Sequence, residues 1–256
     1  MQHILLLPRP LLLLVVVLFI GVCLMLALLI LKWGPKISGP NGSYIPVPAF
    51  MGVVATAWAL SLGFAASDLW GLGNRADRVI AAERSSVMRL LGVSTPSALD
   101  TPDLYDKVIR YVRLVESNEG LRHYGGGFGD PLVDAAVQAL RITVIRTAGS
   151  DIPEAVGAKI VNDFDELQDA RNDRLGISIS LIDPSKWYLL VSFTFLTTLT
   201  IALLHIDRPV AGRIASVIFS ITAFAGLWIL VIHVDPFSDT RADYLSYDLG
   251  VVSPAQ

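Results

Sequence analysis

The chain has 256 residues, of which 53% are hydrophobic and only 17% are charged, and its net charge is −3. Soluble domains usually carry about 25% charged residues, so much of this chain is not built to face water. The slightly acidic balance also argues against a nucleic-acid-binding protein. The single cysteine, Cys23, lies inside an apolar run, cannot form an intrachain disulfide and is interpreted as a packing residue.

Four apolar stretches are long enough to cross a bilayer, which requires about 20 residues of helix. They are residues 11–31, 45–67, 187–204 and 214–232. The first is longer than the core of a signal peptide, roughly 7–15 residues, so we expect it to be retained. Lys32 and Trp33 close the first stretch and Trp187 and Tyr188 open the third, as is typical of residues at a membrane interface.

The long segment between the second and third stretches has helical periodicity and no strand-like alternation. Its predicted helices begin near Asn74, Asp100, Asp130 and Asp151, and the last three starts carry a proline after an acidic or polar cap. The sequence therefore predicts an all-α integral membrane protein with four transmembrane helices. Residues 1–68 hold helices one and two, 69–186 a helical water-facing domain, 187–234 helices three and four, and 235–256 a C-terminal tail.

The distribution of cations predicts the orientation. Four spans put both termini and the large domain on the same side, and the cations near the spans are more numerous there than on the opposite side. Because cytoplasmic segments of membrane proteins are enriched in Lys and Arg, we expect the domain and both termini to be cytoplasmic.

The second stretch carries small residues at every fourth position, namely Ala55, Ala59, Gly63 and Ser67, with Phe64 beside them and Asp68 at its end. Such a stripe either lets another helix approach closely or lines a narrow pore. No acidic or basic residue lies in the middle of any span, which argues against an ion-coupled transporter and is compatible with a passive channel.

Two charges lie on predicted apolar faces of the water-facing domain. Glu83 follows Val79 at four-residue spacing, and Arg171 ends a stripe that contains Phe164 and Leu167. A buried charge is costly unless it is paired, so one hypothesis is that Glu83 pairs with Arg171 or Arg174. The other is that these side chains extend to water.

No constellation of catalytic or metal-binding residues is apparent. The four histidines, His3, His123, His205 and His233, have no partners at metal-ligand spacing. The glycine run 125–129 lacks the lysine of a phosphate-binding loop and is interpreted as a turn. We therefore expect no enzyme activity, no cofactor and no metal.

Two stretches resemble a family of bacterial membrane proteins. The first is LSLGFAAS (60–67), followed by NRADR (74–78) and AAE (81–83); the second is DARNDRL (169–175), followed by two spans and VDPFS (234–238). They resemble a bestrophin-like family of unknown function over roughly residues 45–253, although the tail departs from the family pattern at Asp239. Glu83, Arg171 and Arg174 match motif positions, and we expect structural ion pairs among them and Arg75 and Arg78.

The resemblance implies a function and a set of partners. Bestrophins are pentameric anion channels, so it implies an oligomeric channel for small anions, lined by the second transmembrane helix, in the bacterial inner membrane. The alternative is a non-conducting accessory subunit of a larger membrane complex, in which the small-residue stripes contact unlike subunits. The expected partners are lipid and either further copies of the chain or those subunits, with no nucleic acid.

Overall fold

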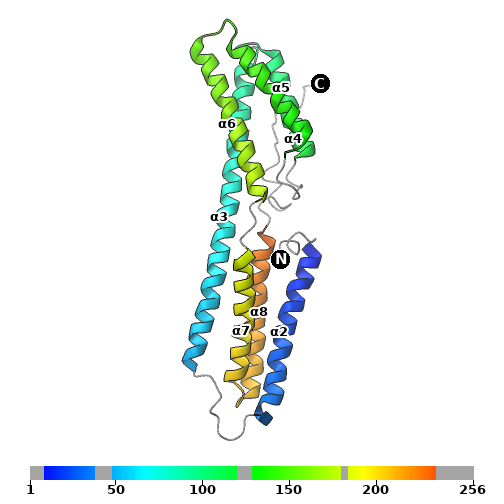
Figure 1. The fold of residues 1–256 in the computed structure, drawn as a ribbon, viewed down its shortest axis with the longest axis vertical. Helices are drawn as coiled ribbons and strands as arrows, with labels where there is room; N and C mark the ends of the chain where they lie inside the picture. The colour runs from blue at the N-terminus through cyan, green and yellow to red at the C-terminus, as the bar shows by residue number, and fades with distance from the viewer. Residues whose placement is uncertain (1–8, 38–47, 120–128, 180–183, 235–256) are drawn as a thin grey trace. The chain divides into compact units, whose positions relative to one another are not determined.

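The computed structural model describes residues 9–37, 48–119, 129–179 and 184–234, and these form seven helices and no strand. The helices are α2 (Arg9–Ile37), α3 (Pro48–Ser94), α4 (Pro102–Asn118), α5 (Pro131–Ala148), α6 (Glu154–Ile179), α7 (Pro184–Leu204) and α8 (Pro209–Ile232). The predicted all-α class is thus observed throughout the described residues. In Figure 1 the colour of the helices gives their order along the chain, from blue near the N-terminus toward red.

Four of these helices are long and apolar enough to cross a membrane, judged by length and composition. The apolar segments are Pro10–Gly34, Ala49–Ser94, Ser185–Leu204 and Pro209–Ile232. Each of them contains most or all of one of the four stretches predicted from the sequence. A continuous apolar run of about 20 residues is the strongest signal that a sequence contains.

The chain divides into two compact units, and α3 contributes to both. The first contains α2, α3 up to Gly71, α7 and α8; the second contains α3 from Leu72 together with α4, α5 and α6. From the sequence, the second span is expected to end at residue 67 and the next helix to begin near Asn74. The structure instead has one uninterrupted helix there, because Gly71 and Gly73 lower helix propensity without preventing a helix, and no proline follows Pro48 in it.

In the first unit α2, α7 and α8 pack side by side, and the inner side of α3 joins their core (Figure 1). The core contains Ile20 of α2, Trp58 and Leu69 of α3, Leu190 of α7 and Leu227 of α8. Small residues let two of these helices approach closely. A Cβ atom on Gly212 of α8 would lie 2.6 Å from a methyl carbon of Leu31 on α2, so this position tolerates only glycine without rearrangement.

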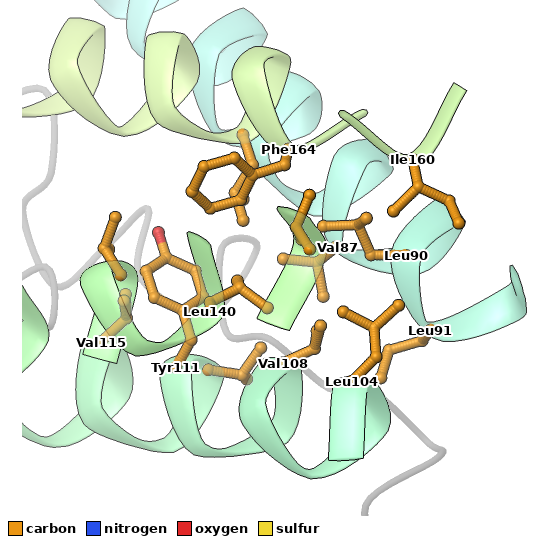
Figure 2. Packing of buried hydrophobic residues seen from close by; sticks show 14 of the residues in the cluster. Val87, Leu90, Leu91, Leu104, Val108, Tyr111, Val115, Leu140, Ile160 and Phe164 are labelled. Atoms are coloured by element: carbon orange, nitrogen blue, oxygen red, sulfur yellow. The ribbon is translucent and has the colours of Figure 1, made fainter. Parts of the chain in front are cut away.

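The second unit is a four-helix bundle built from amphipathic helices. Its core takes residues from all four, including Val87, Leu104, Leu140 and Phe164, each at most 2% exposed. Figure 2 shows these side chains interdigitating, with the hydroxyl of Tyr111 as the one polar atom among the sticks. Local sequence sets the helix starts: Asp130 caps α5 by accepting a hydrogen bond from the amide of Leu132 at 2.8 Å.

Candidate functional site

The apolar half of α3 is the least covered of the four candidate spans. Only 11% of its most apolar stretch is buried within the chain, against 22%, 44% and 33% for α2, α7 and α8. The exposed side carries a column of small residues: Gly52, Thr56, Ala59, Gly63 and Ser67. Beside this column lie large apolar side chains, and Phe64 is 66% exposed. Within the described part of the chain, little covers this narrow face.

The residues of the predicted stripe differ in their exposure. Ala59, Gly63 and Ser67 are exposed, but Ala55 is half-buried and Thr56 takes its place in the exposed column. The reason is geometric, since a helix of 3.6 residues per turn drifts by about 40° for each four-residue step. A strict four-residue spacing therefore rotates away from any fixed face within three steps.

The opposite side of α3 is held against the rest of the first unit by Trp58. Its indole N–H donates to the Thr194 hydroxyl at 3.0 Å, and its ring meets that of Phe219 edge-on at 5.1 Å between centroids. Because a buried indole N–H needs an acceptor, this bond selects one rotation of α3 about its axis. That rotation turns Gly63 and Phe64 outward.

The end of this apolar segment is joined to α7 by an ion pair. Lys186 donates to Asp68, and both side chains are nearly half exposed. Exposed ion pairs contribute little to stability, about 0–1 kcal/mol. This pair therefore marks a point where α3 and α7 meet more than it stabilises the fold. The pairing gives Asp68, at the end of the predicted second span, a fixed neighbour at this boundary.

The hydroxyls of α7 are satisfied within the helix. Thr194, Thr197, Thr198 and Thr200 each donate to the carbonyl four residues earlier, at 2.7–2.8 Å. His205 and His233 contact backbone carbonyls in the same way. Within the described residues no group of three or more His, Cys, Asp or Glu side chains could hold a metal ion.

A buried network of charges lies in the second unit, centred on Glu83. Arg174 donates to the Glu83 carboxylate through Nε at 2.7 Å, and the Tyr111 hydroxyl donates to its other oxygen at 2.6 Å. Glu83 is 0% exposed and Arg174 is 6% exposed. The sequence left open whether Arg171 or Arg174 approaches Glu83, and the structure places Arg174 there.

Arg171 forms ion pairs with two other carboxylates, those of Glu119 and Asp134. It donates to both Glu119 oxygens and, at 2.7 Å, to Asp134. Arg174 also reaches Glu119, at 2.9 Å, so this carboxylate joins the two arginines. Glu119 is not among the predicted site residues, although it follows the buried Val115 by four residues and so ends the apolar stripe of α4. The network thus ties α3, α4, α5 and α6 together.

Glycine at position 129 makes room for these contacts. A Cβ atom there would lie 2.4 Å from Nη2 of Arg171 and 2.8 Å from a carboxylate oxygen of Asp134. Both of those atoms are already held in an ion pair. The last glycine of the predicted turn therefore has a packing role, whereas residues 125–128 lie outside the described part of the chain, as does the tail 235–256.

The arginines also set the charge state of Glu119. Burial alone would raise the pKa of this carboxyl, but hydrogen bonds and the charges of Arg171 and Arg174 outweigh it and hold the pKa below its ordinary value of 4.5. Burial by itself would lower the pKa of Arg171. The hydrogen bonds of Arg171 to Glu119 and Asp134 outweigh burial and raise this pKa above its ordinary value. Glu119 and Arg171 are therefore both ionised at neutral pH.

We predict that acid weakens the second unit through Glu119. Because its pKa is lower in the folded than in the unfolded chain, its contribution is complete above pH 4.5 and is lost as the pH falls through the folded-state pKa. The thermal midpoint of Glu119→Gln should lie well below that of the wild type at neutral pH, and the gap should narrow below about pH 4.5. A difference between the two thermal midpoints that stays constant with pH would contradict this prediction. The control is Glu154→Gln, because Glu154 is exposed at the start of α6.

Arg75 and Arg78 were predicted to form ion pairs, and the structure gives them a different setting. Within the described residues neither has a carboxylate partner, and Arg78 donates only to the carbonyl of Asn74, at 3.2 Å. Both line an open groove of about 520 Å³ in the second unit, between α3 and α6. They are exposed, so they contribute no buried charge to the network around Glu83.

These features define an all-helical membrane protein with four apolar helices and a four-helix bundle held by buried charges. A bestrophin-like domain model matches residues 17–241, so the chain belongs to the bestrophin-like family. This confirms the resemblance inferred from the motifs and extends it into the first span. No curated protein sequence matches the chain.

Solved structures show the same fold. The chain superimposes on a membrane protein with a TM-score of 0.65 at 14% identity, covering 90% of this chain and 94% of the other. Two mutated forms of a bacterial bestrophin homolog from Klebsiella pneumoniae give TM-scores of 0.65 and 0.64 at 15% and 16% identity. The two matches cover 92% and 94% of those chains, and each covers 91% of this chain.

Proposed function

We propose that this protein is an oligomeric channel for small anions, in which the exposed face of α3 lines the pore. The observation that carries the proposal is the uncovered column of small residues on a helix that is otherwise fixed by Trp58. Membership of the bestrophin-like family supports the same reading, because the name bestrophin refers to anion channels.

A comparison with α8 shows why the face of α3 calls for an explanation. The small residues of α8, Gly212, Ser216, Ser220 and Ala223, are buried within the chain, and Gly212 packs against α2. A Cβ atom on Gly63 would meet nothing within 4 Å. Small residues on a membrane helix usually serve close approach, yet among the described residues nothing approaches Gly63 of α3 in this way.

The chemistry of this face suits a passive pore. Thr56 and Ser67 offer hydroxyls, and Phe64 is a large apolar side chain that can narrow a pore when it is repeated around an axis. Apolar constrictions of this kind regulate ion passage by excluding water. No charged residue lies along this face between Gly52 and Ser67, so the proposal involves no coupling to protons or other ions.

The second unit is proposed to face water on the cytoplasmic side of the bacterial inner membrane. The outer sides of α4 and α6 carry charged residues, including Asp106, Arg110, Arg113 and Asp165. Such surfaces cannot lie in hydrocarbon. The bias of cations toward this side of the four spans supports the cytoplasmic assignment for this unit and for both termini.

The outer face of α5 is proposed to contact another copy of the chain. Unlike α4 and α6, it exposes large apolar side chains, with Ile142 at 58% and Ile145 at 62%. In a water-facing bundle, exposed apolar residues on one side of a helix indicate a protein interface. Contact with another copy would bury this face.

We predict that Ile142→Glu combined with Ile145→Glu dissociates the oligomer, because two carboxylates would have to be desolvated at the interface. Native mass measurement of the protein in nanodiscs should then show single copies of the 27.7 kDa chain in place of the assembly. The control is Ala158→Glu with Asn172→Glu, two exposed positions of α6. Equal masses for both double variants would exclude α5 as the contact.

The proposed function is tested by anion flux into liposomes that contain only this purified chain. Chloride-dependent flux that is absent from protein-free liposomes is the expected result. Absence of flux, together with isolation of a single copy bound to unlike membrane subunits, would exclude a channel built from this chain alone. It would favour the accessory-subunit alternative.

A further inference from the structure

The groove between α3 and α6 in the second unit has two dissimilar ends. Its arginines, Arg75, Arg78 and Arg89, come from α3, and its carboxylates, Glu166, Asp169 and Asp173, come from α6. Its floor is made of small or apolar side chains such as Val79 and Ala170. A volume of about 520 Å³ lies within the range of small-molecule sites.

One end of the groove is filled by contacts of its own. Arg89 donates through Nε to Asp163 at 2.6 Å, through Nη1 to Ser85 at 2.8 Å and through Nη2 to Ser86 at 2.9 Å. It also pairs with Glu166. Four of the five N–H donors of this guanidinium are therefore engaged, so this end offers little to a ligand.

The other end has opposite charges that do not meet. In the described chain, no ion pair within 4.0 Å involves Arg75, Arg78, Asp169 or Asp173. The two guanidiniums lie on the α3 wall and the two carboxylates on the α6 wall of the same groove. Guanidiniums favour phosphate and carboxylate ligands, whereas carboxylates accept hydrogen bonds from an ammonium group.

The charge balance selects the class of ligand. Two positive and two negative side chains leave this end of the groove neutral, so a simple anion would be attracted by one wall and repelled by the other. A molecule with both charges satisfies both walls at once. We propose that this groove binds a zwitterion that carries a phosphate and an ammonium group, as glycerophosphoethanolamine or the headgroup of phosphatidylethanolamine does.

The test is calorimetric titration of the full-length protein in nanodiscs with glycerophosphoethanolamine and, separately, with inorganic phosphate. The wild type should bind the zwitterion saturably and more tightly than phosphate. Arg75→Ala with Arg78→Ala should weaken binding of the zwitterion about tenfold or more, the effect of losing charged hydrogen bonds. Stronger binding of phosphate than of the zwitterion by the wild type would overturn the proposal.

The carboxylates provide a reciprocal test. Asp169→Asn with Asp173→Asn should weaken binding of the zwitterion and strengthen binding of phosphate, because the repulsive wall becomes neutral. The matched controls are Arg84→Ala and Asp165→Asn, which change exposed charges of α3 and α6 outside the groove. If the controls lose as much affinity as the groove variants, or if no saturable binding occurs, the proposal is wrong.

Two lipid compositions distinguish the source of the ligand. A bound lipid headgroup would compete with the soluble probe, so the apparent affinity for glycerophosphoethanolamine should fall in nanodiscs of phosphatidylethanolamine compared with phosphatidylglycerol. Equal affinities would assign the groove to a soluble zwitterion. Since the titration measures binding and not flux, its failure is independent of the channel proposal.

Discussion

Replacing Arg174 with alanine should destabilise the second unit by about 3–5 kcal/mol, the usual effect of breaking a buried ion pair by removing one partner. The loss leaves Glu83, which is 0% exposed, with the Tyr111 hydroxyl in place of a charge of opposite sign. It also removes one of the two arginines that neutralise Glu119. The free energy of unfolding from denaturant titration, with hydrogen exchange of the α4 amides, measures the effect.

The double variant Glu83→Met with Arg174→Met separates pairing from size. If the cost of Arg174→Ala arises from an uncompensated buried charge, removing both charges should cost less than removing the arginine alone. Arg84→Ala is the control, because this arginine of α3 is exposed, and surface substitutions usually change stability by less than about 0.5 kcal/mol. A loss for Arg174→Ala as small as that of the control would contradict the account.

Replacing Phe64 with alanine should raise anion flux in reconstituted liposomes. On the proposed pore face, Phe64 is the large exposed aromatic side chain next to Gly63, and truncating it widens an apolar constriction and admits water. Gly63→Leu should lower flux for the opposite reason, since it adds bulk where a Cβ atom has open space.

The matched control for Phe64 is Phe195→Ala. Phe195 is an exposed phenylalanine on α7, 38% accessible, and under the proposal it faces lipid and takes no part in conduction. Its flux should equal that of the wild type at equal protein density. Equal flux for both variants would place Phe64 against lipid, and the pore would then have to be lined by another helix.

The spans and the helices of the bundle could be predicted because they depend on patterns of apolar residues that run along the sequence. Helical periodicity also identified Glu83 and Arg171 as charges on apolar faces, which is a one-dimensional signal. The choice between Arg171 and Arg174 as the partner of Glu83 could not be predicted. These residues lie three positions apart on one helix, and the choice depends on how α6 is rotated against α3 and α4.

Other features depend on contacts between residues distant in sequence. Lys186 and Asp68 are separated by 118 positions, and Glu119 became part of the network only because the fold brings the end of α4 to Arg171 and Arg174 of α6. The continuity of α3 through Gly71 and Gly73 could not be predicted either, because glycine also occurs in turns. Sequence identified the small residues of α3, but only the structure shows that they are exposed, whereas those of α8 are covered within the chain.

Accessibility of a cysteine at position 59 tests the pore-lining face most directly. Cys23 is buried, so Cys23→Ser gives a background without thiols, to which Ala59→Cys or Ile218→Cys is added. Both positions are exposed in the isolated chain, on α3 and α8 respectively. If the face of α3 lines an aqueous pore, a water-soluble, membrane-impermeant thiol reagent should label position 59 and block flux, and leave position 218 unlabelled. If neither position is labelled, the face of α3 lies against lipid or protein and the proposed pore is wrong.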